Sequence, residues 1–293
     1  MLNGKYIFCL SFFLTICLHV HARENTKKIS VLSYNVAGLP DFISQSHPKR
    51  YTKLISPLLN EFDVVLVQED FIYHRDLISR SRHRYLSKPD CDVFSKGGHH
   101  FGFNAWHCLV GLGDGLNRLS QIPFLELKRV TWKKCSGYLM RSSDCLTTKG
   151  FSFASHKISN NYYVHIYNLH ADAGSHRKDK KARLSNFRQL AQFINQRSTN
   201  QAVIVAGDTN SLYSDENSPL EEFLLSTGLR DAWVTLGSSS HERIDKIFFR
   251  SSETLSITPL SHKVESKRFV TKDNEPLSDH EAVSVNFMLS YRD

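Results

Sequence analysis

Polar side chains that can bind a metal or move a proton flank several short hydrophobic runs of this sequence. The runs are rich in β-branched residues, as in buried strands. Because α/β sheets place their ligands at strand ends, these groups are candidates for one shared site. A single acid there is more often a turn former, but six such groups together predict a site. The groups are Tyr34-Asn35, Gln68-Glu69-Asp70, Asn168-Leu169-His170, Gly207-Asp208-Thr209-Asn210, Asp245 and Asp279-His280.

The residue types favour phosphate chemistry assisted by a divalent cation. The carboxylates of Glu69 and Asp279 and the amide oxygen of Asn35 are hard oxygen ligands. Such ligands suit Mg²⁺, which keeps several waters and also binds substrate phosphate. His280 follows a carboxylate in the sequence. With another buried acid to hold its ring, this imidazole would stabilise an attacking water or accept its proton.

Strands and helices must position these groups, and the hydrophobic pattern predicts both. Apolar residues from Tyr51 to Phe62 recur at helical spacing, and Pro57 is expected to kink or break that helix. A second helix, capped by Ser175, would bury one face of residues 184–194. Residues 85–149 lack periodicity and predict long loops with a few strands. Strands are expected at 29–34, 64–67, 151–154, 162–167, 202–206, 244–250 and 282–289, with 151–154 and 162–167 antiparallel neighbours, and a short helix at 221–226.

The chain as a whole is expected to be one globular domain behind an export signal. It has 293 residues, 41% hydrophobic and 23% charged, without repeats or a low-complexity linker. Residues 6–18 are apolar, follow Lys5 and precede Val20-His21-Ala22, so residues 1–22 are predicted to be a signal peptide cleaved after Ala22. A retained anchor is the alternative, but this run is shorter than the ~20 residues that a spanning helix needs. We therefore expect a secreted protein, extracellular or periplasmic.

Removal of the signal peptide would leave four cysteines. In an oxidising compartment an even number of clustered cysteines favours disulfides over reactive thiols, and four allow three pairings. Short separations make Cys91–Cys108 and Cys135–Cys145 the simplest pairs. A zinc site is the rival interpretation, but the sequence has no C-x2-C pair.

At its polar strand ends the chain resembles the endonuclease/exonuclease/phosphatase superfamily of metal-dependent phosphoesterases. The resemblance spans nearly all of residues 29–289, and the motifs are specific because they occur together and in order. It implies an α/β fold, a four-layer α/β/β/α sandwich of two mixed, largely antiparallel β-sheets flanked by helices, with the site at one edge between the sheets. Residues 23–293 would form this catalytic domain. The motifs are Ser-Tyr-Asn-Val at 33–36, Val-Gln-Glu at 67–69, Asn-Leu-His at 168–170, Gly-Asp-Thr-Asn at 207–210, Ile-Asp-Lys-Ile at 244–247 and Ser-Asp-His at 278–280.

The resemblance assigns metal binding to three residues. Glu69 would be the main Mg²⁺ ligand, and Asn35 and Asp279 would assist it. Mg²⁺ is therefore the expected cofactor.

Five further residues would carry the reaction. Asp208 would orient the attacking water, and Asn210 would hold a phosphate oxygen. Asp245 would align the ring of His280, which would activate the water or stabilise the transition state. His170 would contact the phosphate. In-line displacement without a covalent intermediate is then expected.

A narrower resemblance points to secreted bacterial sphingomyelinases, a phospholipase C type. It rests on residues 119–124, 143–151 and 164–171, including the cysteine spacing and Lys149-Gly150-Phe151, a triplet that is alternatively a strand start common to many relatives. The sequence departs from that branch at residues 269–277, which are short and polar where such sphingomyelinases carry an apolar, aromatic hairpin for the bilayer. The aromatic stretch 99–107 would supply an exposed loop instead, or belong to the core.

We expect a secreted Mg²⁺-dependent phosphodiesterase, most like a sphingomyelinase-type phospholipase C. Its substrate would be a sphingomyelin-like phospholipid at a membrane surface, and the protein would be a monomer. A secreted deoxyribonuclease-like endonuclease acting on nucleic acid is the alternative, and a catalytically inactive binding module is a third hypothesis. The basic stretch from His176 to Arg188 and the net charge of +8 favour anionic partners of either kind, unless the stretch is only a solvated helix face.

Overall fold

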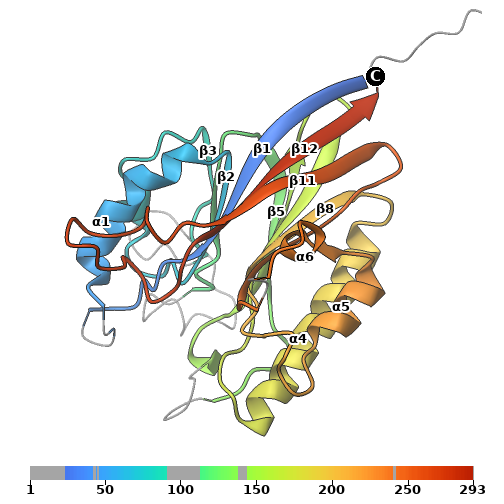
Figure 1. Ribbon diagram of the computed structural model, residues 1–293. Helices are drawn as coiled ribbons and strands as arrows, with labels where there is room; N and C mark the ends of the chain where they lie inside the picture. Colours follow the sequence, from blue (N-terminus) through green and yellow to red (C-terminus); the bar gives the residue numbers. More distant parts are fainter. Residues whose placement is uncertain are drawn as a thin grey trace, which may run out of the picture.

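Two six-stranded β-sheets form the centre of the computed structural model (Figure 1). The first sheet has the order β11-β12-β1-β2-β4-β3, and the second has the order β5-β6-β7-β8-β10-β9. In chain order the strands are β1 (Glu24–Asn35), β2 (Val64–Gln68), β3 (Tyr85–Leu86), β4 (Asn117–Ser120), β5 (Phe124–Thr131), β6 (Gly150–Lys157), β7 (Tyr163–His170), β8 (Ala202–Asp208), β9 (Arg230–Asp231), β10 (Asp245–Arg250), β11 (Leu255–Val264) and β12 (Val283–Arg292).

The structure describes residues 24–41, 44, 46–90, 113–137, 144–239 and 242–292. The expected signal peptide, the expected Cys91–Cys108 pair and the aromatic stretch 99–107 all lie outside the described residues. Within the described part of the chain, no helix is long and apolar enough to cross a membrane.

Strand pairing follows the expected mixture of directions. β1 runs parallel to β2, and β7 runs parallel to β8. The other pairs of neighbouring strands are antiparallel, including β6 and β7, which were predicted to be antiparallel neighbours. The predicted mixed, largely antiparallel sheets are therefore confirmed.

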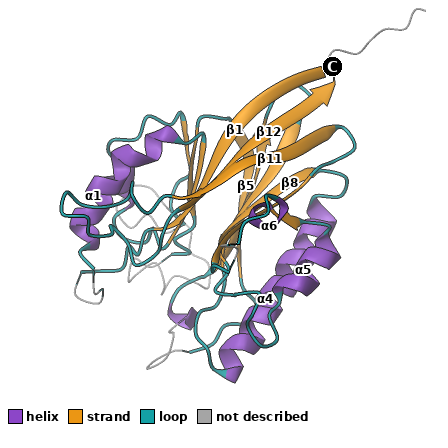
Figure 2. Ribbon diagram, in the orientation of Figure 1, coloured by secondary structure: helices purple, strands orange, loops and turns teal. Residues whose placement is uncertain are grey.

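Three apolar cores separate four layers. Between the sheets, Val31 and Leu66 of the first sheet belong to the same buried cluster as Ile166 and Ile204 of the second. The outer face of the first sheet is covered by α1, and that of the second by α4 and α5, so helices flank the strands on both sides (Figure 2). This arrangement confirms the four-layer α/β/β/α sandwich. The helices are α1 (Pro48–Leu58), α2 (His74–Ile78), α4 (Arg177–Arg197), α5 (Leu220–Thr227) and α6 (Ala232–Thr235), with 3-10 turns at Leu59–Glu61 and Asp144–Leu146.

Local details differ from the sequence prediction: the short elements α2, β9 and α6 were not predicted, and one helix cap and one long strand also differ. Helix α4 is capped by His176 rather than Ser175, because the Asp179 carboxylate accepts a hydrogen bond from the His176 backbone at 3.0 Å in a capping box. Strand β11 was not predicted, since Pro259 interrupts its pattern. The proline is tolerated because β11 is an edge strand whose register shifts between Pro259 and Ser261. Pro57 acts as expected, because α1 ends at the next residue.

A disulfide joins Cys135 to Cys145, as the sequence predicted. It closes the segment between β5 and β6 at the edge of the second sheet. The Trp132 indole, three residues before Cys135, donates a hydrogen bond to the backbone oxygen of His170 at 2.8 Å. The cross-linked segment is thereby attached to the end of β7, where the candidate site begins.

Candidate active site

The predicted polar groups converge because four parallel strand ends and one antiparallel start meet at the same edge. In the first sheet, Asn35 at the end of β1 is in register with Gln68 at the end of β2, so Glu69 follows beside it. In the second sheet, His170 at the end of β7 is in register with Asp208 at the end of β8. Asp245, at the start of the antiparallel β10, also pairs with Asp208. The two sheets therefore place the predicted site residues at one shared edge.

The side chains of five of these residues contact one another around Asp208. The Asn35 amide donates to Glu69 Oε1 at 3.0 Å and to Asp208 Oδ2 at 3.2 Å. His170 Nε2 lies 3.4 Å from Asp208 Oδ2 and 3.8 Å from Glu69 Oε1. His280 Nε2 lies 3.7 Å from Asp208 Oδ2. Residues up to 245 positions apart in sequence therefore form one cluster.

His280 is held by the acid that the sequence proposed for it. Its Nδ1 is 2.8 Å from Asp245 Oδ2, so the ring presents Nε2 to the cluster. Burial disfavours the charged ring, but the hydrogen bond and charge of Asp245, together with the other nearby carboxylates, outweigh burial and raise the pKa of His280 to about 10. The imidazole is consequently a cation at neutral pH.

For Asp208, Glu69 and His170, unlike His280, burial sets the direction of the pKa shift. Burial, and next the charge of Asp245, raise the pKa of Asp208 to about 6. Burial also raises the pKa of Glu69 above its ordinary value. Burial, and next the positive charge of Lys149, lower the pKa of His170 well below its usual range, so this ring is neutral. Its side chain is only 1% exposed, which places it behind the carboxylates.

This donor set fits a divalent cation. Ligand-type atoms of Asp208, Asp245 and His280 lie within 4.8 Å of one another, and because His280 is protonated the two carboxylates are the metal donors among them. Glu69 adds a carboxylate that is 20% exposed at the same edge. Burial raises the pKa values of Asp208 and Glu69 despite the nearby charges of His280 and Lys149, and a hard cation would further stabilise the ionised carboxylates. Asn35 shows its amide nitrogen to the cluster, while its amide oxygen accepts a hydrogen bond from the Ala37 backbone at 3.1 Å.

Two of the residues expected at the site have side chains outside this cluster, although the backbone N–H of Asn210 donates to Asp208 Oδ1 at 2.9 Å. Asp279 is exposed, and its carboxylate accepts a hydrogen bond from the Ser278 hydroxyl at 3.3 Å. Asn210 lies in the loop after β8, where its side-chain amide donates to the Ala171 backbone oxygen at 3.0 Å. Both are close in sequence to cluster members, but neither side chain is turned to Asp208 by a described hydrogen bond.

The backbone of Glu69 is held in the left-handed region, with φ 56°. Such a conformation is unfavourable for a side chain larger than glycine and persists only where neighbours enforce it. The Glu69 backbone oxygen accepts hydrogen bonds from Gly38 at 3.0 Å and Phe71 at 2.8 Å. A Cβ at Gly38 would lie 2.5 Å from that oxygen, so only glycine allows this approach. Asp70 points elsewhere, to His74 and Asn117.

Gln68 and Asn168 link the two sheets directly beneath the cluster. The Gln68 amide donates to Asn168 Oδ1 at 2.7 Å, and the Asn168 amide donates to the backbone oxygens of Val67 at 2.8 Å and Asn117 at 3.1 Å. Gln68 and Asn168 are fully buried. Because they precede Glu69 and His170, their bridge sets the relative position of these two residues across the sheets. Both appeared in the sequence motifs, but a hydrogen bond between residues 100 positions apart leaves no pattern to find.

Lys149 is a further charged group of the site that sequence reasoning treated only as part of a motif. It is buried, and its ammonium lies 2.5 Å from Asp144 Oδ1. Its positive charge opposes the raised pKa of Glu69 and contributes to the lowered pKa of His170. The sequence signal was a lysine immediately before a buried strand.

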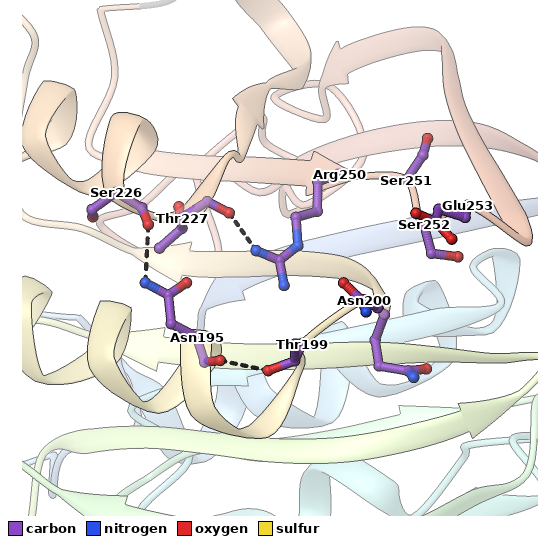
Figure 3. A pocket seen from close by; sticks show the side chains of 10 residues that line it. Asn195, Thr199, Asn200, Ser226, Thr227, Arg250, Ser251, Ser252 and Glu253 are labelled. Carbon is purple, nitrogen blue, oxygen red and sulfur yellow. Dashed lines mark hydrogen bonds between the residues drawn. The ribbon is translucent and has the colours of Figure 1, made fainter.

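A polar cavity of about 610 Å³ opens at the other end of the second sheet (Figure 3). It lies between the ends of α4 and α5 and the end of β10. Arg250 spans it and donates to the backbone oxygens of Thr227 and, at 2.6 Å, Ser198. Asn195 donates to the Ser226 backbone oxygen at 2.9 Å. The polar groups of this cavity thus cap two helix ends and are remote from Asp208.

Comparison with known proteins gives homologues and a shared fold. No family model matches the chain. Proteins named sphingomyelinase from Mycobacterium bovis and Mycobacterium tuberculosis are 35% identical over 274 residues, which cover 88% of this chain and 52% of theirs. The chain therefore spans about half the length of the curated relatives that it matches.

Solved structures with the same architecture include a sphingomyelinase, a beta toxin and TDP2 complexed with single-strand DNA product. Sphingomyelinase C from Streptomyces griseocarneus has a TM-score of 0.62 at 17% identity, covering 89% of this chain and 99% of that one. A mutant beta toxin from Staphylococcus aureus with bound magnesium ions has a TM-score of 0.60 at 16% identity, covering 91% and 100%. D. rerio TDP2 complexed with single-strand DNA product has a TM-score of 0.62 at 20% identity, covering 89% and 98%. The chain therefore has the endonuclease/exonuclease/phosphatase fold expected from its motifs, and it is a homologue of the mycobacterial proteins named sphingomyelinase.

Proposed function

We propose that this chain is a secreted, Mg²⁺-dependent phosphodiesterase that hydrolyses a sphingomyelin-like phospholipid to release its phosphorylated headgroup. The convergence of Asn35, Glu69, His170 and His280 on Asp208 carries the proposal, because it joins hard oxygen donors to a cationic imidazole. The names of the mycobacterial homologues favour sphingomyelin as substrate. The magnesium ions of the related beta toxin support the choice of metal.

Glu69 and Asp208 would hold the metal or its waters, and Asn35 would join them by turning its amide oxygen to the cation. Bound Mg²⁺ would neutralise charge on the phosphate and favour ionisation of the attacking water. Asp208, whose pKa of about 6 lies near neutrality, is suited to orient that water and accept its proton.

His280 acts on the phosphate rather than on the water in this scheme. A pKa of about 10 keeps the ring protonated, so Nε2 donates to a non-bridging oxygen as negative charge develops there. Asp245 holds the ring in that orientation through Nδ1. Of the two roles that the sequence left open for this histidine, the geometry and charge favour transition-state stabilisation.

Parallel assays of the purified full chain test the proposal. Sphingomyelin vesicles, glycerophospholipid vesicles and plasmid DNA are each incubated with Mg²⁺ or with EDTA. We expect sphingomyelin hydrolysis that EDTA abolishes. Nicked plasmid with intact phospholipid would instead assign the chain to the nuclease alternative, which the DNA-bound TDP2 structure keeps relevant. No hydrolysis of any substrate would support an inactive binding module.

Variants connect the activity to the site. Glu69→Gln removes one negative charge from the metal site and should lower turnover by roughly 100-fold or more, as should His280→Ala. Glu253→Gln is the matched control, because Glu253 is exposed and lines the remote cavity. Near-native turnover of Glu69→Gln or His280→Ala would refute the site assignment.

A further inference from the structure

The cations of α4 fall into two groups, and the first group is neutralised within the protein. Lys180 pairs with Glu216 at 3.5 Å, and Arg188 pairs with Glu222 at 2.7 Å. Arg183 points inward and donates to the backbone oxygens of residues 172 and 174, at 2.9 Å each. Arg197, the last residue of α4, pairs with Glu126. These four side chains therefore have structural partners and need no external anion.

The second group is exposed and stands where a helix disfavours positive charge. Arg177, Lys178 and Lys181 are solvent-exposed, and no described residue forms an ion pair with them. They occupy the first five residues of α4, at the positive end of the helix dipole, where cations are destabilising. The only acid of that turn, Asp179, is buried in the capping box. Natural proteins place charges against such a preference mainly at functional sites, so these uncompensated cations are candidates for a functional role.

Two lysines from another segment extend this group. The backbone N–H of Lys133 donates to Gln189 Oε1 at 2.8 Å, and the Lys134 backbone oxygen accepts a hydrogen bond from the Asn186 side chain at 2.9 Å. Both lysine side chains are exposed. Residues 178, 181, 185 and 189 share one face of α4, because they are spaced by three or four positions. The α4 basic patch is defined here as Lys133, Lys134, Arg177, Lys178 and Lys181.

This patch is attached to the flank of the candidate site. Trp132, next to Lys133, donates to the His170 backbone oxygen at 2.8 Å. The Asn186 side chain that binds the Lys134 segment also accepts from the Asp172 backbone at 3.0 Å, two residues after His170. Figure 1 shows α4 beginning at the end of the molecule opposite the C-terminus. The exposed cations and the catalytic cluster therefore lie at one end of the second sheet.

The turn where related sphingomyelinases are expected to carry an apolar hairpin does not offer a membrane anchor here. Phe269 is buried against Tyr34, with ring centroids 4.6 Å apart, and Leu277 is also buried. The exposed residues between them carry both signs of charge, as in Lys272 and Asp273.

We propose that the α4 basic patch docks the protein onto anionic lipid headgroups and so turns the catalytic cluster toward the membrane. This inference rests on the proposed function, because a soluble enzyme must hold its site at the bilayer to reach a lipid. Charge complementarity carries it: five exposed cations, on the start of α4 and on the segment packed against Asn186 and Gln189, lie at the same end of the second sheet as the site. Anionic membranes attract lysine and arginine near their surface. The attraction is electrostatic, so salt screens it.

Vesicle co-sedimentation of the full chain tests the proposal without any substrate. Vesicles of phosphatidylcholine alone, which carry no net charge, are compared with vesicles in which about 30% of the lipid is anionic phosphatidylglycerol. We expect binding only to the anionic vesicles, weakening as NaCl is raised. The triple variant Lys133→Gln, Lys178→Gln, Lys181→Gln should have a partition coefficient about 100-fold lower. Each charge removed is expected to weaken binding about fivefold, and the three factors multiply.

The matched control removes three charges from the opposite end of the sheets, through Lys28→Gln, Lys157→Gln and Arg292→Gln. It should bind nearly as well as the unchanged chain. The patch variant should melt no lower than the unchanged chain, because removal of cations from the helix start relieves an unfavourable interaction. This melting curve separates loss of docking from loss of folding.

Four outcomes would overturn the proposal: absence of binding to anionic vesicles, undiminished binding of the patch variant, equal loss in the control, or binding of plasmid DNA that depends on the patch while vesicle binding does not. Failure of the proposed function has a different signature. In that case anionic vesicles bind through the patch, but sphingomyelin is not hydrolysed.

Discussion

The bridge between the sheets at Asn168 offers a sharp test of how this site is positioned. Asn168→Leu keeps the branching and the number of side-chain heavy atoms but removes three hydrogen bonds, one from Gln68 and two to the backbone oxygens of Val67 and Asn117. Each buried hydrogen bond contributes about 1 kcal/mol, and each group left without a partner costs about 1–3 kcal/mol. We therefore expect the free energy of unfolding to fall by roughly 3–5 kcal/mol.

Urea unfolding of the full chain, followed by circular dichroism, measures this loss. Asn286→Leu is the matched control, because Asn286 is exposed and donates one hydrogen bond, to Ser261 at 3.0 Å. It should change stability by no more than about 0.5 kcal/mol. A double-mutant cycle with Gln68→Met should give a coupling energy of about 1 kcal/mol for the amide pair.

The bridge should also matter for the site, because Gln68 and Asn168 lead directly into Glu69 and His170. Calorimetric titration of folded Asn168→Leu with Mg²⁺ should therefore show weaker binding than the unchanged chain. A loss of stability below about 1 kcal/mol would refute the reasoning, since the sheets would then be held by their apolar core alone.

Three further outcomes follow from the structure. Asp245→Asn should lower the pKa of His280 from about 10 toward its ordinary value, because Asp245 provides the hydrogen bond and charge that raise it; an unchanged imidazole titration by NMR would contradict this. Replacing Cys135 and Cys145 by serine should cost about 2–3 kcal/mol, because the disulfide closes a short loop in the unfolded chain; equal urea midpoints would disprove that contribution. Burial, and next the charge of Asp144, raise the pKa of Asp172 to about 7, so its stabilising contribution is complete below its unfolded pKa and is lost as pH rises through 7. Asp172→Asn should therefore be more stable than the unchanged chain at pH 8 but not at pH 4, and a stability difference independent of pH would argue against this burial effect.

The sequence by itself predicted most of the long strands, the polar residues at their ends and the type of chemistry that these residues favour. Hydrophobic runs before Asn35, Glu69 and Asp208 mark buried strands because alternative placements would expose several apolar side chains. The four-layer sandwich was implied by the resemblance to the endonuclease/exonuclease/phosphatase superfamily, which rests on these motifs occurring together and in order. The Cys135–Cys145 disulfide could also be predicted from the sequence, because the two cysteines are only 10 positions apart.

Only the tertiary structure decided how these groups act. Parallel register brings His170 beside Asp208, and the facing sheets bring both to Glu69, across distances in sequence that no local pattern records. Burial then separates the two histidines: His170 is desolvated and neutral, whereas His280 is paired with Asp245 and cationic. The same folding leaves Asp279 in solvent and turns the Asn35 amide nitrogen inward. Protonation and orientation depend on what packs around a side chain, and that surrounding is assembled from residues far apart in the chain.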